Sequence, residues 1–196
     1  MPAPCPRPIQ STLLQDFHDH EWGEPVAEPG TLFEYLLLHT FQLGFDFPVV
    51  LKRREAFREL LANFEPDRLA RFDEDDLAEL LLNPRILRNR KKLTAAVQDA
   101  RAWLQLRRDV GGEDFLLPFF YAFVGGRPLD NQRSAHNPVP PFTPASEAMS
   151  QELKRRGFAM TGPCTCYNLM QSAGLVNDHL VTCPRHAECQ QLGIDW

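Results

Sequence analysis

A segment near the carboxyl end of the chain carries two residue types that bind transition metals. In the run from Gly174 to Cys183, His179 and Cys183 are four residues apart, so both can reach one ion from a loop or a helical turn. Near the other end of the chain, Cys5 and His18 supply a second pair. Together the four offer the tetrahedral nitrogen and sulfur set that structural zinc prefers. On spacing alone, a buried, hydrogen-bonded His179 beside a packed Cys183 is an open alternative.

Five cations lie within eight residues, between positions 85 and 92. At the start of a long helix they would favour phosphate, because backbone amides and the helix dipole also attract anions there. The cluster predicts contact with a nucleic-acid backbone, and an ordinary solvated helix face is the alternative. Its members are Arg85, Arg88, Arg90, Lys91 and Lys92.

A third group of candidate residues is aromatic and lies in the first quarter of the chain, near histidines and carboxylates. Its members are Phe17, Trp22, Phe45 and Phe47. Nucleobases extruded from a duplex stack on such rings. Aromatic residues at helical spacing also form ordinary core, so the composition leaves both interpretations open.

The elements that position these residues are predicted to be helices. From Thr31 to about Asp109, apolar residues recur every three or four positions, and β-branched alternation is scarce. The acidic run from Asp73 to Asp76 precedes an apolar pattern and is predicted to cap a helix, with a metal site as the alternative. A long helix is expected from near Ile86 to about Gly111.

The later part of the chain alternates between a connector and helices. Glycines and prolines in residues 125–143 predict an extended connector. Thr143 and Pro144 are typical of a helix start, and Gly157 of its end. A last helix is predicted from Cys164 to Ala173.

Length, charge and cysteine content narrow the class of protein. The 196 residues suit one core or two small lobes, and the net charge of −5 requires any contact with nucleic acid to come from a local basic patch. Five irregularly spaced cysteines do not indicate a disulfide framework. Without a membrane-length apolar stretch or a signal-like amino terminus, we expect a soluble, cytoplasmic monomer with no membrane association.

Several fixed strings resemble the 3-methyladenine DNA glycosylase I family, a compact member of the helix-hairpin-helix glycosylases. They occur in the same order over most of the chain. Among them are Phe17-His-Asp-His-Glu-Trp-Gly23, the Leu51-Lys-Arg-Arg-Glu55 run, Leu153-Lys-Arg-Arg-Gly-Phe158 and Gly174-Leu-Val-Asn-Asp-His179. The resemblance implies an all-α fold with a helix-hairpin-helix-like element. It implies one domain over residues 1–196 with two helical lobes, 1–30 plus 125–196 and 31–124.

The same resemblance implies a structural Zn²⁺ site, because the family's four ligand positions correspond to Cys5, His18, His179 and Cys183. All four ligand types are present. Metal bound there would join the two chain ends, so that metal affinity becomes folding stability.

The base pocket departs from the family pattern. The position of the family's base-recognising glutamate holds His39, and the pocket's usual tyrosines and tryptophan correspond to Leu14, Phe17 and Phe47. Flat surfaces are kept, but hydrogen bonding is lost. Neutral histidine offers one donor and one acceptor and can also become charged. We therefore expect weaker recognition of a cationic alkylpurine and an altered base specificity.

Two further departures concern catalysis and DNA contact. Asp46 replaces a small polar residue, and it is a candidate for a catalytic carboxylate near the sugar. The alternative is that Asp46 caps the next helix or pairs with an arginine. In the hairpin, Arg85 and Lys91 stand where the family has glycines. Either their cationic side chains take over the phosphate contacts of open backbone amides, or the hairpin no longer binds DNA.

The sequence thus predicts a hydrolase that excises a damaged or alkylated base from double-stranded DNA in base-excision repair. In this prediction Arg85, Arg88, Lys91 and Lys92 hold the DNA backbone. One alternative is a noncatalytic descendant that binds lesions or keeps only the scaffold. Another is a zinc-stabilised interaction protein that does not contact DNA.

Overall fold

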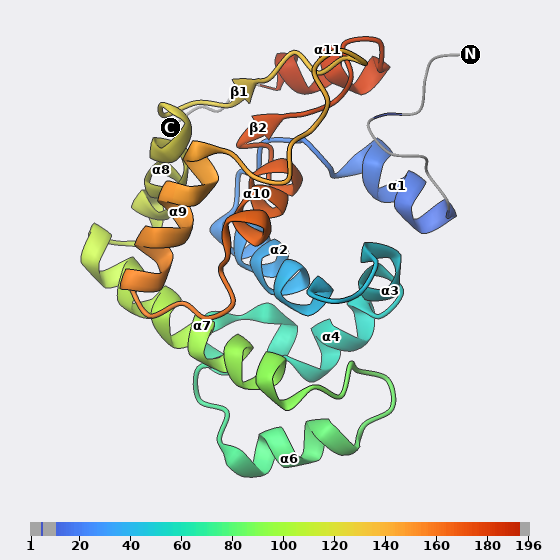
Figure 1. Cartoon of the computed structure of the whole chain (residues 1–196). Coiled ribbons are helices and arrows are strands. Elements are labelled where there is room, and N and C mark those ends of the chain that lie inside the picture. Colours follow the sequence, from blue (N-terminus) through green and yellow to red (C-terminus); the bar gives the residue numbers. More distant parts are fainter. Residues whose placement is uncertain (1–4, 6–10, 193–196) are drawn as a thin grey trace.

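The computed structural model describes Cys5 and residues 11–192, and helices dominate this part of the chain (Figure 1). The predicted helical class is confirmed. The structure adds one small element that the sequence analysis did not predict, a parallel pair of two-residue strands. Among the described residues, no helix is long and apolar enough to span a membrane.

Three helices form the centre of the molecule: α2 (Pro29–Gln42), α7 (Arg90–Val110) and α10 (Pro163–Ser172). Pro29 occupies the first turn of α2, where its missing amide hydrogen costs nothing. The predicted apolar stripe of α2 is fully buried. Helix α10 packs against α2 and against α9 (Pro144–Arg155). The residues of the stripe are Leu32, Phe33, Leu36, Leu37 and Phe41.

Short helices at the amino-terminal side surround one end of α2. Helix α1 (Thr12–His20) begins at Ser11, whose hydroxyl accepts a hydrogen bond from the amide of Leu14. Helix α3 (Phe47–Leu51) packs against both α1 and α2. The other short elements on the amino-terminal side are α4 (Arg54–Leu60), η1 (Ala62–Phe64) and α5 (Pro66–Leu69). The short elements that follow α7 are η2 (Glu113–Phe115), α8 (Leu116–Tyr121) and η3 (Ala122–Val124).

The cationic segment lies partly in a loop between two helices and partly in the first turn of the second helix. Helix α6 (Glu74–Leu82) begins with a reciprocal capping box between Asp73 and Asp76, which confirms the predicted cap. The long helix begins at Arg90, so the prediction of a start near Ile86 was wrong by four residues. The reason is Asn89, whose extended backbone and side-chain bond to the amide of Lys92 make it the N-cap.

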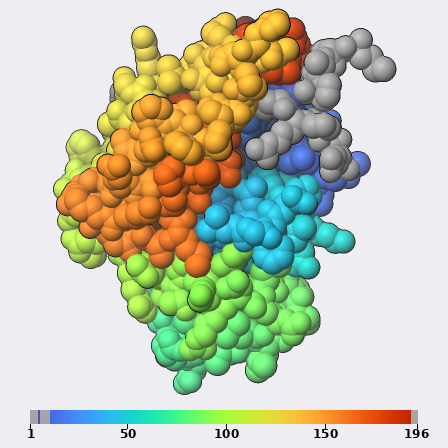
Figure 2. Space-filling model, viewed as in Figure 1, coloured from blue at the N-terminus to red at the C-terminus, as the bar shows by residue number. Residues whose placement is uncertain are grey.

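The connector at residues 125–143 contains no helix, as predicted, but it does contain strand β1 (Leu129–Asp130). Strand β1 pairs in parallel with β2 (Val176–Asn177), which follows α10. Helix α11 (Pro184–Gln191) then completes the described chain. In space-filling form, the connector and α9 lie against the segment of α2 and α3 on one face (Figure 2).

Gly174 allows α10 to turn sharply into β2. Its φ is +65°, and a Cβ there would lie 2.3 Å from the carbonyl carbon of Glu24. Only glycine fits both this backbone conformation and this approach. The residue therefore fixes the crossing of the α10–β2 turn over the segment that follows α1.

Candidate functional site

The four predicted metal ligands lie together, although they come from opposite ends of the sequence. Their ligand atoms all lie within 4.8 Å of one another. The Cys5 Sγ is 3.5 Å from His179 Nδ1, and the Cys183 Sγ is 3.8 Å from His18 Nε2. Sulfur and nitrogen ligands of one tetrahedral zinc ion lie about 3.5 Å apart, given bond lengths of about 2.3 and about 2.0 Å. The arrangement has the dimensions of such a site.

Neighbouring groups orient both imidazole rings toward the cluster. His179 Nε2 lies 2.8 Å from the carbonyl oxygen of Trp22, and His18 Nδ1 lies 2.7 Å from an Asp19 carboxylate oxygen. Because a carbonyl or carboxylate can only accept, each of these nitrogens carries the proton. The opposite nitrogen of each ring is then free to bind a metal.

The cluster is buried, and its groups are poorly suited to water-exposed chemistry. Burial lowers the pKa of His179 to about 4, so this imidazole is neutral at neutral pH. Burial also raises the pKa of the Cys5 thiol to about 12. A metal ion would reverse the latter effect, since a coordinated thiol loses its proton. All four positions are protein side chains, so the set offers a closed site without an open catalytic position.

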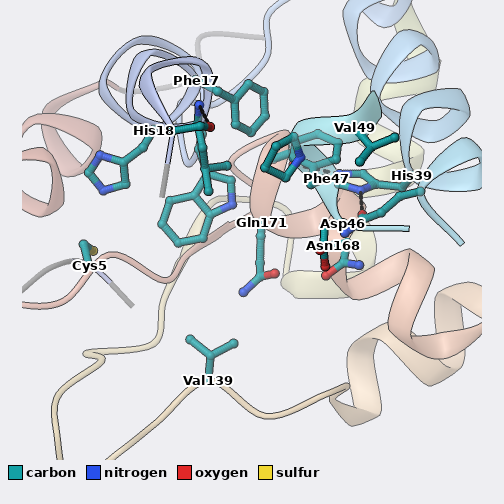
Figure 3. Close-up of a pocket in the computed structure, with 16 residues that line it drawn as sticks. Cys5, Phe17, His18, His39, Asp46, Phe47, Val49, Val139, Asn168 and Gln171 are labelled. Atoms are coloured by element: carbon teal, nitrogen blue, oxygen red, sulfur yellow. Dashed lines mark hydrogen bonds between the residues drawn. The ribbon is translucent and has the colours of Figure 1, made fainter. Parts of the chain in front are cut away.

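A concave site that adjoins the cluster, and that Cys5 and His18 also line, lies between α1, α2, α3, α10 and the connector (Figure 3). Its volume is about 570 Å³, within the range of ligand pockets. The predicted pocket residues Leu14, Phe17, His39 and Phe47 all line it. The structure therefore brings together the side chains that the resemblance implied, around an open space.

The aromatic wall of the cavity is ordered by ring contacts. Phe47 stacks on His39 with centroids 4.9 Å apart and an interplanar angle of 18°, and Phe17 meets Phe47 edge-on at 5.1 Å. Trp22 also lines the cavity, whereas Phe45 is exposed and lies over the Lys92 ammonium. Three of the four predicted aromatic residues thus form part of the site.

His39 is held by hydrogen bonds on both ring nitrogens. Nδ1 lies 2.8 Å from Gln42 Oε1, and Nε2 lies 2.8 Å from Ser172 Oγ. Burial lowers the pKa of His39 to about 4, so the ring is neutral near neutral pH. The ring presents its face to Phe47, and the protein already satisfies its polar edges.

Asp46 also lines the cavity, at the amino end of α3. It occupies the N-cap position of α3 by its backbone, but its side chain accepts no capping hydrogen bond. Its carboxylate forms no ion pair or hydrogen bond with any residue that the structure describes. Within the described part of the chain, Asp46 acts neither as a side-chain cap nor as the partner of an arginine.

Helix α10 contributes three polar wall residues that the sequence analysis did not single out as pocket residues. Asn168, Gln171 and Ser172 line the cavity from one face of the helix, at a spacing of three and four residues. The opposite face carries apolar residues such as Leu169 and Met170, which are fully buried. A polar stripe on an otherwise buried helix was the signal that would have identified them.

Comparison with known proteins places this architecture in a family. The family model described as methyladenine glycosylase matches residues 8–186. The chain is 39% identical over 184 residues to the DNA-3-methyladenine glycosylase of Haemophilus influenzae, with 94% of this chain and 98% of the relative covered. It is 39% identical over 174 residues to DNA-3-methyladenine glycosylase 1 of Escherichia coli, with 89% and 91% covered.

This chain belongs to the methyladenine glycosylase family. A crystal structure of a 3-methyladenine DNA glycosylase I superposes with a TM-score of 0.84 at 39% identity, covering 90% of this chain and 95% of that one. A structure of the Staphylococcus aureus enzyme, described as the basis of its 3-methyladenine recognition, superposes with a TM-score of 0.85 at 31% identity, covering 90% and 92%. The helical fold of this family member is thus that of the glycosylases.

The predicted DNA-backbone cations of this glycosylase-family chain do not form one surface. Arg88 and Lys91 are exposed, and Arg85 is exposed but lies 2.6 Å from Glu59. The side chain of Lys92 is only 4% exposed. Its ammonium donates to the carbonyl oxygen of Phe41 at 2.7 Å and to that of Leu43.

The placement of Lys92 on the DNA-facing surface therefore has to be corrected. The position lies on the inner side of the first turn of α7, where two carbonyls at the end of α2 receive the charge. Burial lowers the pKa of the Lys92 ammonium. Its contacts hold the start of α7 against the loop that leads into α3.

Proposed function

We propose that this protein is a DNA glycosylase that hydrolyses the N-glycosidic bond of an alkylated base and uses its cavity to hold the base. The observation that supports this proposal is the cavity of about 570 Å³, which has a stacked aromatic wall and polar groups that have no partner among the described residues. Extruded bases are held by such combinations of stacking and edge contacts. The cavity is formed by residues from both proposed lobes: Phe17 and Gln171 from one, His39 and Phe47 from the other.

The direct test is the release of free bases from double-stranded DNA treated with a methylating agent. The protein is expected to release alkylated bases, which mass spectrometry identifies. Release of none, with correctly folded protein, would contradict the proposed activity.

We infer that the Cys/His cluster binds one structural Zn²⁺ ion. The donor set, the sulfur–nitrogen distances of 3.5 and 3.8 Å and the orientation of both rings support this assignment. Bound zinc would supply no catalysis here; it would tie the start of the chain and α1 to the segment after β2.

We infer that His39 changes which bases are accepted. A neutral ring with both nitrogens bonded to Gln42 and Ser172 provides no negative charge for a cationic base. Stacking on Phe47 then contributes to binding without selecting for charge. His39→Glu is expected to raise the ratio of cationic to neutral bases released by about tenfold. An unchanged ratio would show that position 39 does not determine this selectivity.

For Asp46 we propose a role as a carboxylate near the sugar, where negative charge stabilises a cation-like transition state. The absence of a partner among the described residues and the position on the cavity wall support this role. Asp46→Asn should slow single-turnover base release by about a hundredfold. Asp114→Asn, an exposed carboxylate outside the cavity, is the matched control. Unchanged release of every accepted base by the Asp46 variant would exclude the role.

We propose that Arg88 and Lys91 contact DNA phosphates from the loop between α6 and α7 and the first turn of α7, with Arg85 joining them when it leaves Glu59. This loop would serve as the hairpin of a helix-hairpin-helix element. Each phosphate contact adds about 0.9 to the slope of log affinity against log salt. Lys91→Gln should lower that slope by about one. An identical slope would remove Lys91 from the DNA-binding surface.

A noncatalytic lesion-binding protein is the second candidate function, and the fully bonded His39 is the observation that favours it. It predicts salt-dependent binding to methylated DNA without base release. Binding and release, measured on the same protein preparation, separate the two functions.

A further inference from the structure

Two of the carboxamides that line the cavity, both on α10, differ in how firmly they are held, and this difference bears on which base fits. Gln171 and Asn168 are three residues apart on α10 and both line the cavity. We propose that Gln171 is a fixed hydrogen-bond acceptor that selects a base with an exocyclic amine, while Asn168 is an adaptable contact. The inference rests on the proposed function, since it assigns the base-reading residues of the same site.

The orientation of Gln171 follows from a buried carboxylate behind it. Asp178 is fully buried, and its two oxygens lie 2.7 Å from Gln171 Nε2 and 2.7 Å from Arg133 Nε. The hydroxyl of Tyr167 donates to Asp178 at 2.5 Å, and the amide of Asn131 at 2.7 Å. Four donors converge on one carboxylate, so every one of these contacts requires Asp178 to accept.

An accepting carboxylate leaves only one orientation for the Gln171 amide. The Nε2 group must face Asp178, because the amide oxygen cannot donate. The Oε1 atom must therefore face the other way. In Figure 3, Gln171 extends toward Val139, with its amide oxygen on the side of Asn168 and Asp46 and its nitrogen on the other side. Oε1 has no partner among the described residues, so it is an acceptor directed into the cavity.

Asn168 is unconstrained by comparison. Its side chain is half-buried and forms no hydrogen bond with any residue in the described part of the chain. Its amide can rotate to present either a donor or an acceptor. It can therefore support bases of either polarity, whereas Gln171 cannot follow such a change without losing Asp178.

A fixed hydrogen-bond acceptor discriminates between bases according to whether they present a donor or an acceptor to it. A base that presents an exocyclic amine can donate to Gln171 Oε1, whereas a base with a carbonyl at the same carbon places two oxygens together. Sites that require a particular hydrogen bond reject the analogue that lacks it, because a buried polar group is left unpaired. Gln171 is therefore assigned as the residue that favours an amine-bearing base over its carbonyl analogue.

The experiment measures the affinity of the full-length protein for two free bases, 3-methyladenine and 3-methylhypoxanthine, in which a carbonyl replaces the amine. The natural chain is expected to prefer 3-methyladenine by about tenfold or more. Gln171→Met should reduce the preference to near one. Asn168→Leu should weaken both bases alike and keep the ratio. Gln105→Met, an exposed residue outside the cavity, is the matched control and should change nothing.

Retention of the preference by Gln171→Met, or no preference in the natural chain, or no binding of either base, would overturn the assignment. If Gln171→Met does not fold, Gln171→Asn gives the same test, because it keeps the amide but withdraws the oxygen from the cavity. Base release from methylated DNA is measured in parallel. Gln171-dependent preference without release would refute the glycosylase activity alone, and release with an unchanged preference would refute the base-reading role alone.

Discussion

The Cys/His cluster and the cavity beside it both use residues of helix α1, but they differ in whether their polar groups have partners within the protein. In the cluster, each ring has one nitrogen bonded to the surrounding protein and the other directed at sulfur. In the cavity, the carboxylate of Asp46 and the amide of Asn168 have no partner among the described residues. Asp46 is exposed, whereas Asn168 is half-buried, and a half-buried polar group without a partner costs stability. The comparison indicates that the cluster serves the fold and that the cavity is kept for a ligand.

Removing a cluster ligand should have the largest effect on stability. Cys183→Ala is expected to abolish stoichiometric zinc binding and to lower Tm by about 10 °C or more, since metal binding is coupled to folding. Zinc content by elemental analysis and Tm by calorimetry measure both effects. Cys164→Ala, at an exposed cysteine outside the cluster, is the control and should change neither. Equal zinc content and Tm in the two variants would show that the cluster does not bind structural metal.

The glycine at the turn from α10 into β2 provides the next test. Gly174→Ala would place a Cβ 2.3 Å from the backbone of Glu24 at a φ of +65°, so the free energy of unfolding should fall by about 3 kcal/mol or more. Gly157→Ala has a φ of +90° with nothing within 4 Å, and should cost only about 1 kcal/mol. Denaturant unfolding compares the two. Similar costs would mean that the close approach to Glu24 is easily relieved.

Asp99 lies outside both the Cys/His cluster and the cavity, and only one of its two carboxyl oxygens is hydrogen-bonded in the described structure. Its Oδ1 accepts from the amide of Ala159 at 2.6 Å, its Oδ2 has no partner in the described structure, and burial raises its pKa to about 8. The unfolded carboxyl has a pKa of about 3.9, so above this pH the unfolded chain binds fewer protons. Stability should therefore fall as pH rises from about 4 to about 8.

Asp99→Asn should remove this dependence and stabilise the protein at pH 8 by a few kcal/mol. Denaturant unfolding at several pH values tests it. If the stability of the natural chain changes with pH over this interval in the same way as that of the variant, Asp99 is ionised in the folded protein. The predicted result would distinguish Asp99, which is buried in its protonated form, from the polar groups of the cavity, which we propose to contact a ligand.

Substitution of the stacked ring of Phe47 should affect stability least, but it should clearly affect function. Phe47→Leu should lower kcat/KM for base release by about tenfold to a hundredfold, because stacking contributes about 1–3 kcal/mol per base. Its stability should change little, since Phe47 is only half-buried. Phe115→Leu, at an exposed ring outside the cavity, is the matched control. Equal activity in the two variants would remove the stacked wall from the account.

Local patterns predicted the elements well, but they did not predict which side chains would be buried. The apolar stripe of α2 and the caps at Asp73 and Thr143 follow from spacing of nearby residues, and the structure contains them. Lys92 could not be placed in this way, because its burial depends on two carbonyls about fifty positions earlier in the chain. The orientation of Gln171 likewise depends on Asp178, Arg133 and a strand pairing that only the folded chain creates.

The most direct test of the account is to fill the cavity and follow the chemistry. Val139 lines the wall opposite Gln171, and Val139→Trp would occupy the space proposed for the base. The natural chain should release 3-methyladenine from methylated duplex DNA, and the variant should release none while keeping its zinc content and Tm. Release by the variant at the rate of the natural chain would contradict the claim that this cavity holds the excised base.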